Sequence, residues 1–129
     1  MPITYEIDSE ANFIRTECAG DVTLAEVLDN FRVLEADSAL PDRLDVLLDL
    51  SKMTLLPGSN ELRSAAERIG QLRSKVLWGV CAIVTNSDAM FGMIRMFEVY
   101  AENFFTATRV FRELPEAETW FWSMRLPKG

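Results

Sequence analysis

The sequence predicts one α/β domain with a mixed, mostly parallel sheet and flanking helices, in the order β-β-α-β-α-β-α-β-α. Two short alternating segments open the chain, three later apolar segments have the composition of strands, and amphipathic segments separate those strands. Strands that alternate with helices favour a parallel sheet, and an opening hairpin makes it mixed. The 129 residues match the usual size of one domain. We therefore expect a single domain over residues 1–129.

Local signals mark the opening hairpin and the first helix. Residues 3–8 and 11–18 alternate around the turn-like Asp8-Ser9-Glu10, as paired strands do. Thr23 and Glu26 have the spacing of a capping box, in which each side chain satisfies a backbone N–H at a helix start. A helix is expected from there to about Asp37. Its apolar face consists of Leu24, Val27, Leu28, Phe31 and Leu34.

The next strand and helix follow the same pattern. Residues 44–50, LDVLLDL, are typical of a strand buried on both faces. A loop at residues 55–60 precedes a second amphipathic helix, for which Ser59 is the expected N-cap, or Asn60 if the start shifts by one residue. The apolar face of this helix consists of Leu62, Ala65, Ala66, Ile69 and Leu72.

The remaining elements complete the alternation. Residues 76–85, VLWGVCAIVT, are the strongest strand pattern in the chain, and Asn86-Ser87-Asp88 then caps a third helix that reaches about Phe104. Residues 108–112 form a short strand. Pro115 suits the first turn of a final helix that carries Trp120 and Trp122. Residues two apart diverge on a helix, so these two indoles cannot both point inward.

The charge balance excludes several classes of partner. The chain has 20 acidic and 13 basic residues, a net charge of −7. Nucleic-acid binding needs a basic surface, and so does docking on anionic lipid. No apolar run approaches the roughly 18 residues of a membrane span, and the first ten residues lack the pattern of a signal peptide. We expect a cytoplasmic protein that binds no nucleic acid.

The residue types needed for common catalytic sites are missing. The chain has no histidine, and its two cysteines, Cys18 and Cys81, lie in apolar stretches, where buried free thiols are typical. Catalytic triads and zinc sites built on histidine or paired cysteines are therefore excluded. No lysine follows Gly58-Ser59-Asn60, so a phosphate-binding P-loop is absent. We predict no enzymatic activity, no metal and no cofactor.

The element order and the segment LLDLSKMTLLPGSNEL at residues 47–62 resemble the STAS domain, the fold of the bacterial anti-sigma-factor antagonists. The chain is most similar to the divergent SpoIIAA-like branch of that superfamily. Arg95-Met96-Phe97-Glu98 in the third helix supports this resemblance, as do Phe111-Arg112, Glu116-Ala117 and Trp120 near the end of the chain.

The resemblance implies a regulatory loop. In the antagonists, a loop with Asp-Ser-Ser-Gly opens a helix, and a partner kinase phosphorylates the second serine. The ungapped match puts Pro57, Gly58, Ser59 and Asn60 at these positions, so Ser59 would be the phosphoacceptor within a partner-binding loop. The competing explanation is that Ser59 is only a helix cap. Asp49, near a strand end, is expected to organise this loop or to meet a cation or phosphate.

The third helix carries more apolar surface than one buried stripe requires. Together with the final helix it offers Met93, Met96, Phe97, Tyr100 and Trp120. A protein or homodimer interface fits these residues, and so does a pocket for a lipid-like ligand, as the resemblance to Sec14-like domains implies. Ordinary core packing fits them as well.

We predict a regulatory protein-interaction module whose partner is a kinase or an anti-sigma-like regulator. The alternative is a carrier or sensor of a lipid-like or other apolar small molecule. An exposed Ser59 favours the first function, and an enclosed apolar cavity favours the second.

Overall fold

The sheet in the computed structural model, which describes residues 2–125, follows the order of the chain. Its strands lie side by side as β1-β2-β3-β4-β5. β1 is antiparallel to β2, whereas the other three neighbouring pairs are parallel, so the predicted mixed, mostly parallel sheet is confirmed. The strands are β1 (Ile3–Asp8), β2 (Phe13–Gly20), β3 (Arg43–Met53), β4 (Leu77–Val84) and β5 (Ala107–Phe111).

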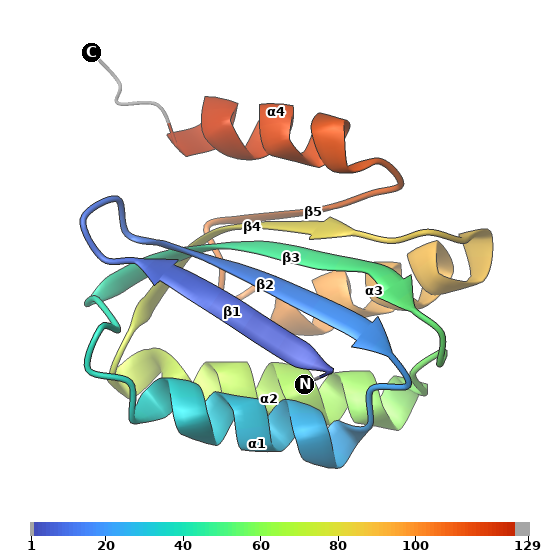
Figure 1. Cartoon of the computed structure of the whole chain (residues 1–129), viewed down its shortest axis with the longest axis horizontal. Coiled ribbons are helices and arrows are strands. Elements are labelled where there is room, and N and C mark those ends of the chain that lie inside the picture. Colours follow the sequence, from blue (N-terminus) through green and yellow to red (C-terminus); the bar gives the residue numbers. More distant parts are fainter. Residues whose placement is uncertain (1, 126–129) are drawn as a thin grey trace.

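Three helices cover one face of the sheet and the fourth covers the other (Figure 1). The connections from β2 to β5 all step in the same direction across the sheet. Right-handed crossovers therefore place their three helices on the same face. The last helix follows the last strand and is free to cross to the opposite face. The helices are α1 (Leu24–Glu35), α2 (Ser59–Gln71), α3 (Asp88–Ala101) and α4 (Leu114–Arg125), and a short 3-10 helix (Leu72–Ser74) follows α2.

The alternation of side chains along the strands divides the buried residues into two clusters. Cys81 and Ile83 of β4 point towards α1, α2 and α3, whereas Val80, Ala82 and Val84 belong to the cluster under α4. β4 is therefore buried on both faces, whereas β3, for which the sequence predicted such burial, has several half-buried residues, among them Val46 and Leu48.

The predicted helix starts are largely confirmed. The Thr23 hydroxyl accepts the Glu26 N–H at 3.3 Å, and the Glu26 carboxylate accepts the Thr23 N–H at 3.0 Å, which completes the capping box. The Ser87 hydroxyl accepts the Met90 N–H at 3.1 Å at the start of α3.

Two predicted ends are wrong. β3 continues three residues past the expected end at Leu50, because Lys52 and Met53 pair with Ala19 and Gly20 of β2. α3 ends at Ala101 instead of reaching Phe104. The chain turns there, and the Thr106 N–H then donates to the Gly79 carbonyl at 3.0 Å, leading into β5.

Three further observations concern the cysteines, the helix lengths and the grouping of acidic side chains. Cys18 and Cys81 are buried free thiols, as expected. None of the helices within residues 2–125 is long and apolar enough to cross a lipid bilayer. Over the same residues, no three His, Cys, Asp or Glu side chains are grouped so that they could hold a metal ion.

Candidate functional site: an apolar cavity beneath the first two helices

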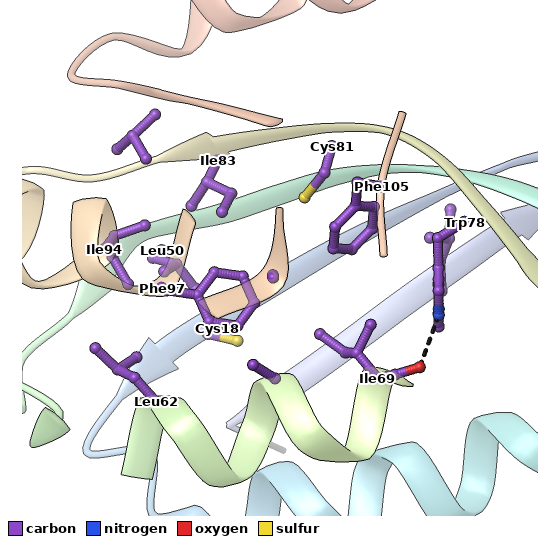
Figure 2. Close-up of a cluster of buried hydrophobic side chains, with 14 of the residues drawn as sticks. Cys18, Leu50, Leu62, Ile69, Trp78, Cys81, Ile83, Ile94, Phe97 and Phe105 are labelled. Carbon is purple, nitrogen blue, oxygen red and sulfur yellow. Dashed lines mark hydrogen bonds between the residues drawn. The ribbon is translucent and has the colours of Figure 1, made fainter. Parts of the chain in front are cut away.

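A cavity of about 170 Å³ lies between the sheet and helices α1 and α2. β2, β3 and β4 form its floor, α1 and α2 form its roof, and Ile94, Phe97 and Phe105 close one side. Figure 2 shows side chains from these elements, among them Cys18, Leu62 and Phe97, converging on the space between sheet and helix. The lining is almost entirely apolar.

The cavity exists because α1 covers the sheet incompletely. Leu34 is the one buried residue of this helix. The C-terminal end of α1 is anchored, since Arg68 of α2 donates to Glu35 at 2.7 Å and the Tyr5 hydroxyl of β1 donates to Asp37 at 2.7 Å. The N-terminal part of α1 contributes only partly buried apolar side chains, such as Val27 and Phe31, to the core, and both line the cavity.

Two residues of β3, the central strand, show that the helices cover the sheet incompletely. Val46 and Leu48 of β3 point towards the helices and line the cavity, yet both stay partly accessible to solvent. At the helix side, Thr23, Asn30 and Glu61 are exposed or half-buried lining residues. We conclude that the cavity opens between α1 and α2.

The polar groups of the cavity are few. No lysine or arginine contributes to the lining, and Glu61 supplies its one carboxylate, among the residues that the structure describes. Glu61 lies at the opening and accepts the Gly58 N–H at 3.0 Å. Deeper inside, the Trp78 indole N–H donates to the Ile69 carbonyl at 2.9 Å, as the dashed line in Figure 2 shows. Thr16 is the remaining buried polar side chain of the lining.

The two cavity thiols are held in the neutral form. Burial raises the pKa of Cys18 to about 12, and the charges of Asp49 and Glu17 add to this effect. Burial also raises the pKa of Cys81, and Glu98 contributes in the same direction. Because the thiolate is the nucleophilic form, neither cysteine is activated near neutral pH.

The Ser59 loop lies beside the cavity opening and differs from its prediction. The N-cap of α2 is Gly58, with extended φ and ψ of −83° and 163°, and Ser59 is the first helical residue. The prediction of Ser59 or Asn60 as the cap is therefore wrong. The Glu61 carboxylate accepts the Gly58 N–H, and the N-cap of α2 therefore lies one residue before the predicted Ser59. Gly58, Ser59 and Asn60 are all exposed.

Asp49 does not join this loop. It lies within β3, where its carboxylate accepts the Ser51 N–H at 2.9 Å. Its side chain is on the opposite side of the sheet from α2, close to Thr4 and Arg15. The continuation of β3 to Met53 explains this, because the strand end lies further along than the sequence indicated.

The apolar residues predicted around the third helix do not form one surface. Phe97 lines the cavity, and Met93 and Tyr100 pack half-buried against the same cluster. Met96 is 37% exposed and points away from it. Trp120 lies on the other face of the sheet, where its ring packs against Phe111 at 5.6 Å between centroids.

Sequence reasoning missed the residues that α1 and β2 contribute to the cavity. Ile14, Thr16 and Cys18 alternate along β2 with their side chains buried. A threonine within that inward-facing alternation was a detectable signal, since a buried hydroxyl normally needs a partner. The space beside it depends on how α1 packs, which the local pattern does not encode.

Comparison with known proteins adds no functional assignment. No family model matches the chain, and no curated protein matches it significantly. The similarity to the STAS superfamily stays a prediction.

Proposed function

We propose that this protein binds a small apolar molecule in the cavity beneath α1 and α2, as a carrier or sensor and without catalysing a reaction. The observation that carries the proposal is the cavity itself, about 170 Å³ in volume, with an apolar lining and an opening between two helices. A cavity of about 150 Å³ lined by Leu, Ile and Phe binds benzene in another protein.

Energetics support the proposal. The opening between α1 and α2 leaves apolar side chains of the lining accessible to water. An apolar ligand in the cavity would remove this surface from water, which is favourable by about 25 cal/mol per Å². It would also supply packing contacts that the lining lacks.

The chemistry of the lining supports binding over catalysis. The thiols of Cys18 and Cys81 have raised pKa values and stay protonated. Glu61 is turned towards the backbone of Gly58. General acid–base catalysis needs a titratable side chain within hydrogen-bond reach of the substrate, and besides the two thiols the described lining offers only Glu61, at its opening.

Methyl NMR with toluene as the probe tests this function. Toluene should shift the methyl signals of Ile14, Ile83 and Ile94 around the cavity, while Leu47 and Val80 under α4 stay unchanged. Ala65→Leu, which extends a side chain into the cavity from α2, should abolish the shifts. Ala25→Leu, on the exposed side of α1, is the matched control and should leave them intact. Equal shifts on both faces, or none, would contradict the proposal.

A second candidate function is the regulatory interaction module. Its support is the loop before α2, where Ser59 is exposed and Leu55 and Leu56 are 43% and 49% exposed. Ser59 at the first position of a helix would also place a phosphate near free N–H groups. If this loop binds a partner, Ser59→Asp and the pair Leu55→Ser with Leu56→Ser should each change the proteins recovered by affinity purification. Ser64→Asp within α2 is the control, and identical recovery from all variants argues against the module.

A further inference from the structure

Thr16 is a largely buried side chain whose hydroxyl has no hydrogen-bond partner in the described part of the chain and borders the cavity. Buried polar side chains in residues 2–125 are Thr16 at 8% exposure, Asp45 at 8% and Thr85 at 0%. The Asp45 carboxylate accepts the Val80 N–H at 2.7 Å, and the Thr85 hydroxyl donates to the Phe111 carbonyl at 3.4 Å. Thr16 forms no side-chain hydrogen bond within the described part of the chain, and it lines the cavity.

A hydroxyl at the position of Thr16 destabilises the protein when it has no hydrogen-bond partner. Thr16 lies in β2 between Tyr5 of β1 and Leu48 of β3, under the helices, so it is not in an edge strand. When the cavity holds neither a ligand nor water, the hydroxyl makes no hydrogen bond, at a cost of about 1–3 kcal/mol, and a valine would fill nearly the same volume without that penalty. A ligand atom that hydrogen-bonds to the hydroxyl removes the penalty.

The rest of the lining restricts the charge of the ligand. A carboxylate or phosphate would find no lysine or arginine among the described lining residues, and Glu61 at the opening would repel it. A cation would have to leave water for an apolar interior, where one carboxylate at the rim cannot compensate for its desolvation. A neutral ligand has neither difficulty.

We propose that the cavity selects a small neutral molecule with an apolar, ring-sized body and one hydroxyl or carbonyl group, which hydrogen-bonds to the Thr16 hydroxyl. This inference rests on the proposed binding function and adds the class of ligand and the residue that sets its specificity. The apolar body lies among Ile14, Leu48 and Ile83, and the polar group points towards β2.

Phenol and toluene form a matched probe pair, since they differ by a hydroxyl in place of a methyl group. Their dissociation constants should be measured by methyl NMR titration for the wild type and for Thr16→Val. We expect Thr16→Val to lower the preference for phenol over toluene by roughly threefold to tenfold, the usual net effect of one neutral hydrogen bond. Thr16→Ser, which keeps the hydroxyl, should retain the preference.

Thr108→Val is the control for a buried hydroxyl elsewhere. The Thr108 hydroxyl is also buried without a partner, but it lies between α3 and β5, away from the cavity. This variant should leave the phenol-to-toluene ratio unchanged. Thr16→Ala provides the same comparison if Thr16→Val does not fold.

The outcomes separate the two proposals. If both probes bind the wild type and the ratio is the same in Thr16→Val, the role of Thr16 is overturned while the cavity remains a binding site. If neither probe binds the wild type, the binding function fails together with the inference. Binding of benzoate as tightly as phenol would overturn the neutral class of ligand.

Discussion

On the α4 side of the sheet the side chains interlock around Phe121, whereas on the α1 side they surround a cavity. Phe121 is fully buried, and its ring meets Phe13 edge-on at 6.1 Å and Trp122 at 5.4 Å between centroids. Figure 1 shows α4 alone on this face, opposite α1 and α2. One helix with aromatic side chains thus covers its face of the sheet, whereas three helices on the other face leave a cavity.

A buried ion pair fixes the tightly packed side. Arg125 Nε donates to Asp45 Oδ2 at 2.7 Å, with side chains 12% and 11% exposed, and the guanidinium also lies over the Phe13 ring. Asp45 Oδ1 lies so close to β4 that a Cβ at Gly79 would meet it at 1.9 Å. On the other face, the ion pair between Arg68 and Glu35 is more exposed, with side chains 21% and 33% accessible. The α4 face is therefore fixed by an ion pair and a ring cluster, whereas the larger apolar cluster on the other face encloses the cavity.

Replacing a phenylalanine on each face gives the largest expected difference. Phe121→Ala should destabilise the fold by about 3–5 kcal/mol, as for a fully buried ring. Phe31→Ala, at the half-buried roof of the cavity, should cost about 1–2 kcal/mol, because less packing is lost. Urea unfolding of both variants measures the difference. Equal losses would mean that the two faces are equally well packed.

The ion pair is expected to contribute somewhat less. Arg125→Met should destabilise the protein by about 3 kcal/mol, since it leaves the Asp45 carboxylate buried without its cation. Arg32→Met breaks an exposed pair with Asp29 on α1 and should leave the stability almost unchanged, because solvent screens such pairs. Denaturant midpoints compare the two. A small loss in Arg125→Met would show that Asp45 is stabilised by the Val80 N–H alone.

Enlarging one alanine on each face should produce effects of opposite sign. Ala117→Leu, fully buried under α4, should destabilise by about 1–3 kcal/mol through overpacking. Ala65→Leu at the cavity should instead stabilise by about 0.5–2 kcal/mol, as cavity-filling changes do. Thermal unfolding reports both signs, and destabilisation by Ala65→Leu would indicate that the cavity cannot accept the added methyl groups.

The smallest expected effect concerns pH. The raised pKa of Cys18, about 12 against 9.0 for the free group, favours the folded state fully below pH 9. This contribution is lost as pH rises from about 9 towards 12, because the unfolded thiol ionises first. Cys18→Val should therefore lose stability less steeply than the wild type between pH 8 and 11 in urea titrations. Superimposable curves for the two proteins would contradict the assignment to Cys18.

The sequence predicted the order of elements because local signals mark each start. Thr23 with Glu26 and Ser87 before α3 are such signals, and both were confirmed. The end of β3 was missed because Ser51 and Lys52 look like loop residues, while pairing with β2 keeps them extended. Pairing between distant segments leaves no trace in a local pattern.

The candidate site was less predictable for the same reason. The third helix was expected to carry the apolar surface, but only Phe97 of the five predicted residues lines the cavity. The cavity depends on the angle and anchoring of α1, which are set by Glu35 with Arg68 and by Tyr5 with Asp37. The burial of Cys18 and Cys81 was predictable, since their apolar surroundings are local.

The strands lie in the sheet in the same order as in the sequence, and this order affects how the protein folds. Each new strand can dock onto the one made just before it, so the sheet can grow from one edge while synthesis proceeds. Every crossover closes a modest loop, which keeps the entropic barrier of each step low. Arg125 is different, because it reaches back 80 positions to Asp45 and 114 positions to the Ala11 carbonyl. We expect α4 to dock last, onto a sheet that is already assembled.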